Sequence, residues 1–101
     1  MKILLLTFLL LSSLLSEEYI VDQKHKTFKP QTLHLKVGDT ITFKNSDPFS
    51  HNAYTDDEAN EFDIGMQKSG TTKSIKIKKA GSFDIECAIH PTMLIKVDVS
   101  K

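Results

Sequence analysis

The sequence predicts an all-β protein: a small antiparallel Greek-key β-sandwich that follows an N-terminal signal peptide. Helix signals are weak, whereas apolar residues repeatedly alternate with polar ones in short runs. Turn residues separate these runs at intervals of about 8–12 residues. About six to eight short strands with one apolar face each are typical of a sandwich or a Greek-key barrel.

Four of these runs lie in the first half of the chain. Pro30 suits a strand end or a sheet edge, and Gly38-Asp39 is a turn signal. The segment Asn45-Ser-Asp-Pro48 ends the fourth run. The apolar positions of the four runs are, in order, Tyr19 and Val21; Phe28; Leu33, Leu35 and Val37; and Ile41 and Phe43.

The second half begins with a polar, irregular segment over residues 46–61, for which no strand is predicted. Turn signals at Ser69-Gly70 and Ala80-Gly81 divide the rest. Because side chains alternate between the two faces of a strand, Cys87 should point inward at the end of its strand. The apolar positions are Phe62 and Ile64; Ile75 and Ile77; Phe83, Ile85 and Cys87; and Ile95, Val97 and Val99.

Residues 1–16 are predicted to be a signal peptide. Lys2 supplies the positive charge, residues 3–15 are mostly apolar, and Ser16 is a small residue at a plausible cleavage point. The run is short for a membrane span, which needs about 20 apolar residues; an uncleaved anchor is the alternative. Residues 17–101 then form one exported, periplasmic or otherwise secreted domain without stable membrane insertion.

The charge balance and the cysteine count exclude several classes of function. The 13 lysine and arginine residues balance 13 acidic residues, so the basic excess of a nucleic-acid binder is missing. The chain has 1 cysteine, which excludes an internal disulfide. An odd cysteine in an exported protein indicates a reactive thiol, an intermolecular bridge or a metal ligand. We expect a monomer.

Four side chains carry the predicted chemistry. Cys87, His90 and Met93 lie at three-residue intervals in one short segment, and His51 lies far upstream in a polar loop. A thiolate, two imidazoles and a weak thioether are the donor set of a blue copper electron-transfer site. Pro91 favours a pre-set loop, because proline fixes its own φ and biases the preceding residue toward extended geometry.

The pattern Cys-x-x-His-x-x-Met, preceded by His51-Asn52, resembles the cupredoxins, and most of all their amicyanin- and plastocyanin-like branch. The resemblance extends to residues 28–47, 62–65 and 81–87. It implies that His51, Cys87, His90 and an axial Met93 bind one type 1 copper ion, the histidines through their δ nitrogens. It also implies electron passage through the partly exposed edge of His90. Ser50 stands where plastocyanins usually have proline, and the Cys-to-Met spacing is the short, amicyanin-like one.

The predicted function is that of a carrier of single electrons, not an enzyme. Transient redox proteins such as a cytochrome, a dehydrogenase or an oxidase are the expected partners. One alternative is a copper storage or delivery module that uses the same ligands without redox shuttling. Another is a thiol enzyme built on Cys87 and His90, although a cysteine nucleophile also needs an oriented base.

Other residues outside the four predicted donors also receive predictions. Asn52 could bridge the two ligand loops, His25 and His34 should be solvated, and Met66 is more probable as a core residue than as a ligand. Two groups of side chains are also candidates for contacts with a partner protein. They are a predicted apolar rim around His90, formed by Phe49, Ala88, Ile89 and Pro91, and an acidic cluster, formed by Asp56, Asp57, Glu58, Glu61 and Asp63. We interpret the acidic cluster as a solvated loop; a steering patch for a basic partner is the alternative.

Overall fold

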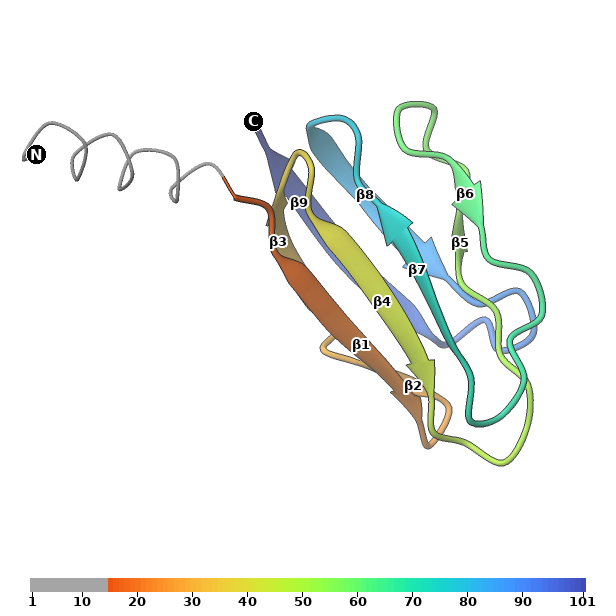
Figure 1. Cartoon of the computed structure of the whole chain (residues 1–101). Helices are drawn as coiled ribbons and strands as arrows, with labels where there is room; N and C mark the ends of the chain where they lie inside the picture. The colour runs from red at the N-terminus through yellow and green to blue at the C-terminus, as the bar shows by residue number, and fades with distance from the viewer. Residues whose placement is uncertain (1–14) are drawn as a thin grey trace, which may run out of the picture.

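The computed structural model describes residues 15–101, and the predicted signal peptide therefore lies almost entirely outside the described residues. Within them, nine strands form two sheets packed face to face, which confirms the predicted β-sandwich (Figure 1). No helix in this part of the chain has the length and apolar character needed to cross a membrane.

The first sheet has four strands in the order β2-β1-β4-β7. Its strands are β1 Glu18–Lys24, β2 Thr27–Lys29, β4 Thr40–Asn45 and β7 Thr72–Lys76. The second sheet has five strands in the order β3-β9-β8-β5-β6. Its strands are β3 Thr32–Lys36, β5 Tyr54–Thr55, β6 Phe62–Asp63, β8 Gly81–Glu86 and β9 Leu94–Ser100.

The strand pairing is mixed rather than purely antiparallel. β1 pairs with β4 in parallel, and β3 pairs with β9 in parallel, while the other pairs are antiparallel. Between β1 and β4 the chain crosses to the second sheet, where it forms β3. When it returns to the first sheet, β4 lies beside β1 and runs in the same direction. Apolar alternation predicts which residues form strands, but it carries no information about the direction of a partner strand.

The core lies between the two sheets and consists mostly of the inward positions of the predicted alternation. Val37 is an exception: it follows the end of β3 and is 41% exposed. Phe43 is fully buried and packs edge-on against Phe28, with ring centroids 6.4 Å apart. Its ring is tilted against that of Phe62, with centroids 6.2 Å apart. β5 was not predicted, because a two-residue strand is too short for alternation to identify. β5 is defined by its pairing with β6 on one side and β8 on the other.

Different loops lie at the two ends of the sandwich. The segments after β4, between β6 and β7, and between β8 and β9 meet at the lower end in Figure 1. The loop between β5 and β6, which contains most of the acidic cluster, lies at the upper end. Loops that a rigid sheet holds in place are the usual location of binding residues.

Candidate metal centre

The loop between β8 and β9 carries three of the four predicted donors. Cys87 directly follows β8 and is 2% exposed, and Met93 directly precedes β9 and is 1% exposed. Glu86 and Leu94 pair across the two strands, so the strand pairing closes the loop at its base. Inside the loop, the backbone N–H of Met93 donates to the carbonyl oxygen of His90 at 2.9 Å, which makes a tight turn.

The fourth predicted donor, His51, is held by the loop between β6 and β7. Its backbone forms an isolated antiparallel bridge with Gln67, with hydrogen bonds of 3.0 and 2.7 Å in the two directions. Its side chain is fully buried. The position of the ring is therefore set by backbone contacts as well as by packing.

The structure brings three of the predicted donor atoms together. The Nδ1 atoms of His51 and His90 lie 3.2 Å apart, and Sγ of Cys87 lies 3.9 Å from Nδ1 of His90. Ligand atoms of all three residues lie within 4.8 Å of one another. Donors bound to one transition-metal ion at about 2.0–2.3 Å would be roughly 3–4 Å apart, so the spacing fits a single ion.

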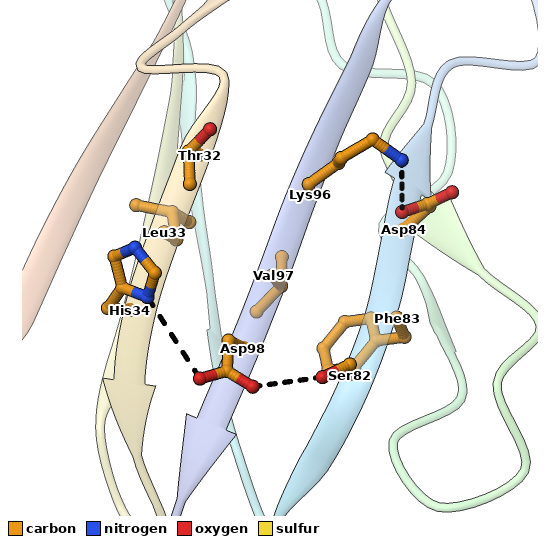
Figure 2. Close-up of a pocket in the computed structure, with 9 residues that line it drawn as sticks. All are labelled: Thr32, Leu33, His34, Ser82, Phe83, Asp84, Lys96, Val97 and Asp98. Atoms are coloured by element: carbon orange, nitrogen blue, oxygen red, sulfur yellow. Dashed lines mark hydrogen bonds and ion pairs between the residues drawn. The ribbon is translucent and has the colours of Figure 1, made fainter.

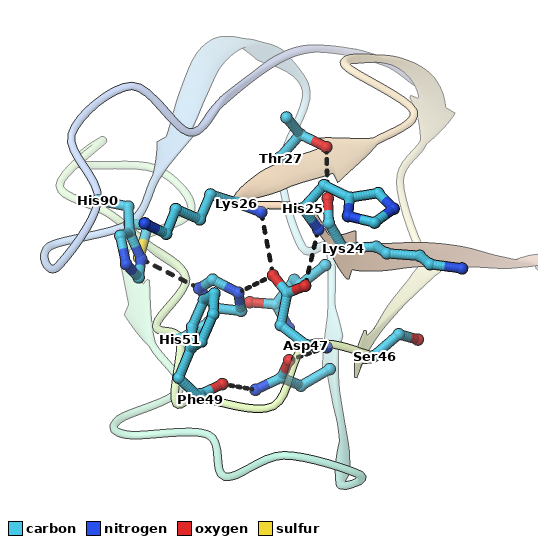
Figure 3. Close-up of polar contacts among 12 residues, drawn as sticks. Lys24, His25, Lys26, Thr27, Ser46, Asp47, Phe49, His51 and His90 are labelled. Carbon is cyan, nitrogen blue, oxygen red and sulfur yellow. Dashed lines mark hydrogen bonds and ion pairs between the residues drawn. The ribbon is translucent and has the colours of Figure 1, made fainter.

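The Nε2 atom of His51 faces a carboxylate that the sequence did not single out. It lies 2.6 Å from Oδ2 of Asp47 (Figure 3). The backbone N–H groups of His25 and Lys26 donate to the two oxygens of the same carboxylate at 2.7 and 3.0 Å. Burial alone would raise the pKa of Asp47. The hydrogen bonds from Lys26, His51 and His25 outweigh burial and lower this pKa to about 2.

Asn52 connects the two ligand loops, as predicted. Its Oδ1 accepts a hydrogen bond from the backbone N–H of Ala88 at 3.2 Å, next to Cys87. Its Nδ2 donates to Oδ1 of Asp63 at 2.8 Å and to the carbonyl oxygen of Gly65 at 3.1 Å. One amide thus joins three segments around the donor cluster.

A buried amide network, which no pattern in the sequence predicted, supports the His51 side of the centre. Gln67 is fully buried; its Nε2 donates to the carbonyl oxygens of Phe43 and Thr71, and its Oε1 accepts from Gln23 at 2.6 Å. Nδ2 of Asn45 donates to the carbonyl oxygen of Gln67 at 2.9 Å. Polar residues inside a loop rarely carry a sequence signal for burial, because their burial depends on partners from other segments.

His90 lies beneath a partly exposed aromatic side chain. The ring centroid of Phe49 lies 5.7 Å from that of His90 and 5.3 Å from that of His51, and Phe49 is 38% exposed. Ile89 is 42% exposed, which agrees with the predicted apolar rim. Burial, the neighbouring His51 and the charge of Lys26 lower the pKa of His90, which favours the neutral imidazole that a metal requires.

Three predictions about other residues have different outcomes. His25 and His34 are exposed, as expected. The prediction that Met66 is a core residue is wrong, since Met66 is 63% exposed. The bridge to His51 turns Gln67 inward, and the adjacent Met66 therefore points outward.

The acidic cluster behaves as a solvated loop. Asp57 is half-buried, and Asp56, Glu58, Glu61 and Asp63 are exposed. Asn60 ties this loop to the connection between β7 and β8, at the end of the sandwich away from the β8–β9 loop that carries His90 (Figure 1). A steering role for the cluster stays a prediction.

A groove on the outer face of β3, β9 and β8 is separate from the donor cluster (Figure 2). Its polar side chains pair with one another: Ser82 donates to Asp98 at 2.9 Å, and Lys96 lies 3.7 Å from Asp84. His34 lies 4.0 Å from Asp98 at the exposed surface. These polar groups form hydrogen bonds and ion pairs with one another, so they do not converge on a point where a ligand could bind. We therefore assign no function to the groove.

Comparison with known proteins agrees with the chemistry of the donor cluster. Residues 17–100 match the family described as copper binding proteins, plastocyanin/azurin family. The methylamine utilization protein MauL of Methylorubrum extorquens is 34% identical over 86 residues, which cover 84% of this chain and 75% of MauL. Amicyanin of Paracoccus denitrificans is 32% identical over 90 residues, which cover 79% of this chain and 63% of that protein.

Solved structures share the fold. An amicyanin variant with Cu(I) superposes with a TM-score of 0.75 at 29% identity, and 82% of each chain is covered. A copper-containing nitrite reductase of Thermus scotoductus superposes with a TM-score of 0.76 at 26% identity, covering 83% of this chain but 22% of that one. The family match spans the whole sandwich, including all four predicted donors. This chain therefore belongs to the plastocyanin/azurin family of copper-binding proteins and is a cupredoxin.

Proposed function

We propose that this protein is an exported blue copper protein that carries single electrons between redox partners. The proposed ligands of its one copper ion are His51, Cys87, His90 and Met93. The observation that carries the proposal is the convergence of a thiolate and two imidazoles, with their ligand atoms within 4.8 Å of one another. The thioether of Met93, which is buried at the base of the same loop, would complete a blue copper donor set.

Copper bound at these residues would supply a one-electron couple between Cu(I) and Cu(II). The sulfur donors favour Cu(I), and imidazole serves both oxidation states. Three sets of contacts restrain the proposed donors. They are the strand pairing at the base of the β8–β9 loop, the His51–Gln67 bridge and the hydrogen bonds of Asn52. Such a restrained site changes little between oxidation states, which favours rapid electron transfer.

The route for electrons in this proposal is the partly exposed ring of His90. The exposed side chains of Phe49 and Ile89 lie beside it and offer a small apolar surface. Small interfaces are usual for transient redox complexes. A cytochrome, a dehydrogenase or an oxidase would dock there and approach the metal closely. Four protein donors would leave no open coordination position for a substrate, which supports an electron carrier rather than an enzyme.

The proposal is tested by the visible spectrum of the protein purified without metal and titrated with Cu(II). We expect an intense thiolate-to-copper band that saturates at one equivalent. Cys87→Ser should abolish the band, and the surface variant His34→Gln should keep it. A folded, unmodified protein without the band, or a strongly blue Cys87→Ser protein, would refute the proposal.

Two further measurements separate the alternatives. Repeated chemical oxidation and reduction with copper retained favours the electron carrier, whereas copper release on reduction favours storage or delivery. Labelling of the Cys87 thiol should be blocked by bound copper. Rapid labelling of Cys87 in the presence of copper would instead favour a thiol enzyme.

A further inference from the structure

Asp47 is a buried carboxylate held against the ring of His51. It is 4% exposed, and its Oδ2 lies 2.6 Å from His51 Nε2 (Figure 3). A carboxylate only accepts hydrogen bonds, so the Nε2 atom of a neutral His51 must carry the proton. The Nδ1 atom then presents its lone pair toward His90, from which it is 3.2 Å distant.

The first hairpin also holds this carboxylate, through contacts that do not involve His51. His25 and Lys26 connect β1 to β2 with φ angles of 56° and 57°, the left-handed geometry of a type I′ turn. Two successive non-glycine residues in this region are uncommon. Their backbone N–H groups point at the two oxygens of Asp47, and the backbone N–H of Asp47 donates to Asn45 Oδ1 at 2.9 Å.

Resting on the proposed function, we propose that Asp47 is a positioning residue that fixes the tautomer of His51 and lowers the reduction potential of the copper. Carboxylate–histidine–metal arrangements orient the ring and increase the basicity of the ligand nitrogen. The buried negative charge favours Cu(II), the more positive ion, because charges interact strongly where water is excluded. The Lys26 ammonium lies over the Phe49 ring at 5.6 Å from its centroid and offsets part of this field.

The charge is tested by Asp47→Asn, which keeps the shape and one acceptor oxygen but removes the negative charge. Because contacts behind a metal ligand typically change affinity by 10–100-fold, we expect the affinity for Cu(II) relative to Cu(I) to fall about tenfold. For a one-electron couple this fall raises the potential by about 59 mV. Protein-film or solution voltammetry measures the shift.

Asp39→Asn is the matched control. Asp39 is fully buried, and its carboxylate accepts hydrogen bonds from the backbone N–H groups of Glu17 at 3.0 Å and Lys36 at 2.9 Å. Asp39 precedes β4, whereas His51 follows the opposite end of that strand. Replacement of Asp39 should lower stability without moving the potential. A blue Asp47→Asn protein with an unchanged potential would overturn the role of Asp47 and leave the proposed function intact.

A second measurement needs neither copper nor a variant. The ¹⁵N chemical shifts of the His51 ring in the metal-free protein, at mildly alkaline pH, report which nitrogen carries the proton. We expect a protonated Nε2 and a bare Nδ1; a protonated Nδ1 would overturn the inference even if Asp47→Asn failed to fold. In contrast, an unmodified protein that forms no blue site would contradict the proposed function, while the ring shifts would still decide how Asp47 orients His51.

Discussion

Replacement of Asn52 by alanine should both destabilise the fold and weaken the copper site. Asn52 is 6% exposed and makes three side-chain hydrogen bonds, to Ala88, Asp63 and Gly65. Each bond contributes about 0.5–1.5 kcal/mol to stability. Asp63 and Gly65 are exposed, so water replaces the lost partner there at little cost. We therefore expect Asn52→Ala to lower the free energy of unfolding of the metal-free protein by about 2 kcal/mol.

Urea denaturation of the metal-free protein measures this loss, and the midpoint of thermal unfolding should fall by roughly 8–16 °C. The same change frees the backbone of Ala88 beside Cys87 from the loop that carries His51. Removal of a contact that orients metal ligands typically costs 10–100-fold in affinity, so Cu(II) should bind at least about tenfold more weakly.

Asn60→Ala separates the two effects. Asn60 is 8% exposed and also makes three side-chain hydrogen bonds, to the backbone of Lys78 and Lys79, at the opposite end of the sandwich. Its loss should cost a similar amount of stability and leave the blue band and the copper affinity unchanged. The reasoning is refuted if Asn52→Ala unfolds with unchanged stability, or if both variants weaken copper binding equally.

Three further predictions concern the proposed axial donor and the response of stability to acid. Met93→Gln should keep copper but lower its reduction potential, because the axial ligand tunes the potential of a blue copper site; an unchanged potential in voltammetry would show that Met93 is not axial. The pKa of His90 in the folded, metal-free chain is lower than its ordinary value of 6.5, so the unfolded chain takes up a proton that the folded chain resists. The free energy of unfolding should thus fall as the pH drops below about 6.5, and His90→Gln should remove that decline. Asp47 acts at lower pH: its stabilising contribution is present above 3.8 and is lost as the pH falls toward about 2. Urea titrations of the metal-free protein across this pH range measure the contributions of His90 and Asp47. A free energy of unfolding that stays constant between neutral pH and pH 4 would contradict the prediction for His90.

Local patterns in the sequence were sufficient for most strands. The alternation of apolar residues over Leu33 and Leu35, or over Ile95, Val97 and Val99, reflects a two-residue period that the chain carries by itself. β5 was missed because its two residues are defined only by the strands on either side. The direction of β4 beside β1 was missed for a similar reason, since the crossover through the second sheet decides it.

The proposed donor set could also be predicted, because three of its four members lie in one short loop. Cys87, His90 and Met93 follow a strand whose apolar phase points inward, and their chemistry is specific even without a structure. The structure brings His51 to the same point, as the resemblance to cupredoxins implied. The assignment of Met66 to the core failed, because the neighbouring Gln67 occupies the inward position in that loop.

The sequence by itself determined the strands, the β-sandwich class and the residue types able to bind copper, because each of these depends on neighbours a few positions apart. Only the tertiary structure decided which strands run parallel, that the acidic loop lies away from His90, and that Asp47 faces the ring of His51. The carboxylate of Asp47 meets the turn at His25 and Lys26 through contacts more than twenty positions apart in the chain. Such contacts depend on the packing of the whole sandwich, which no local period encodes.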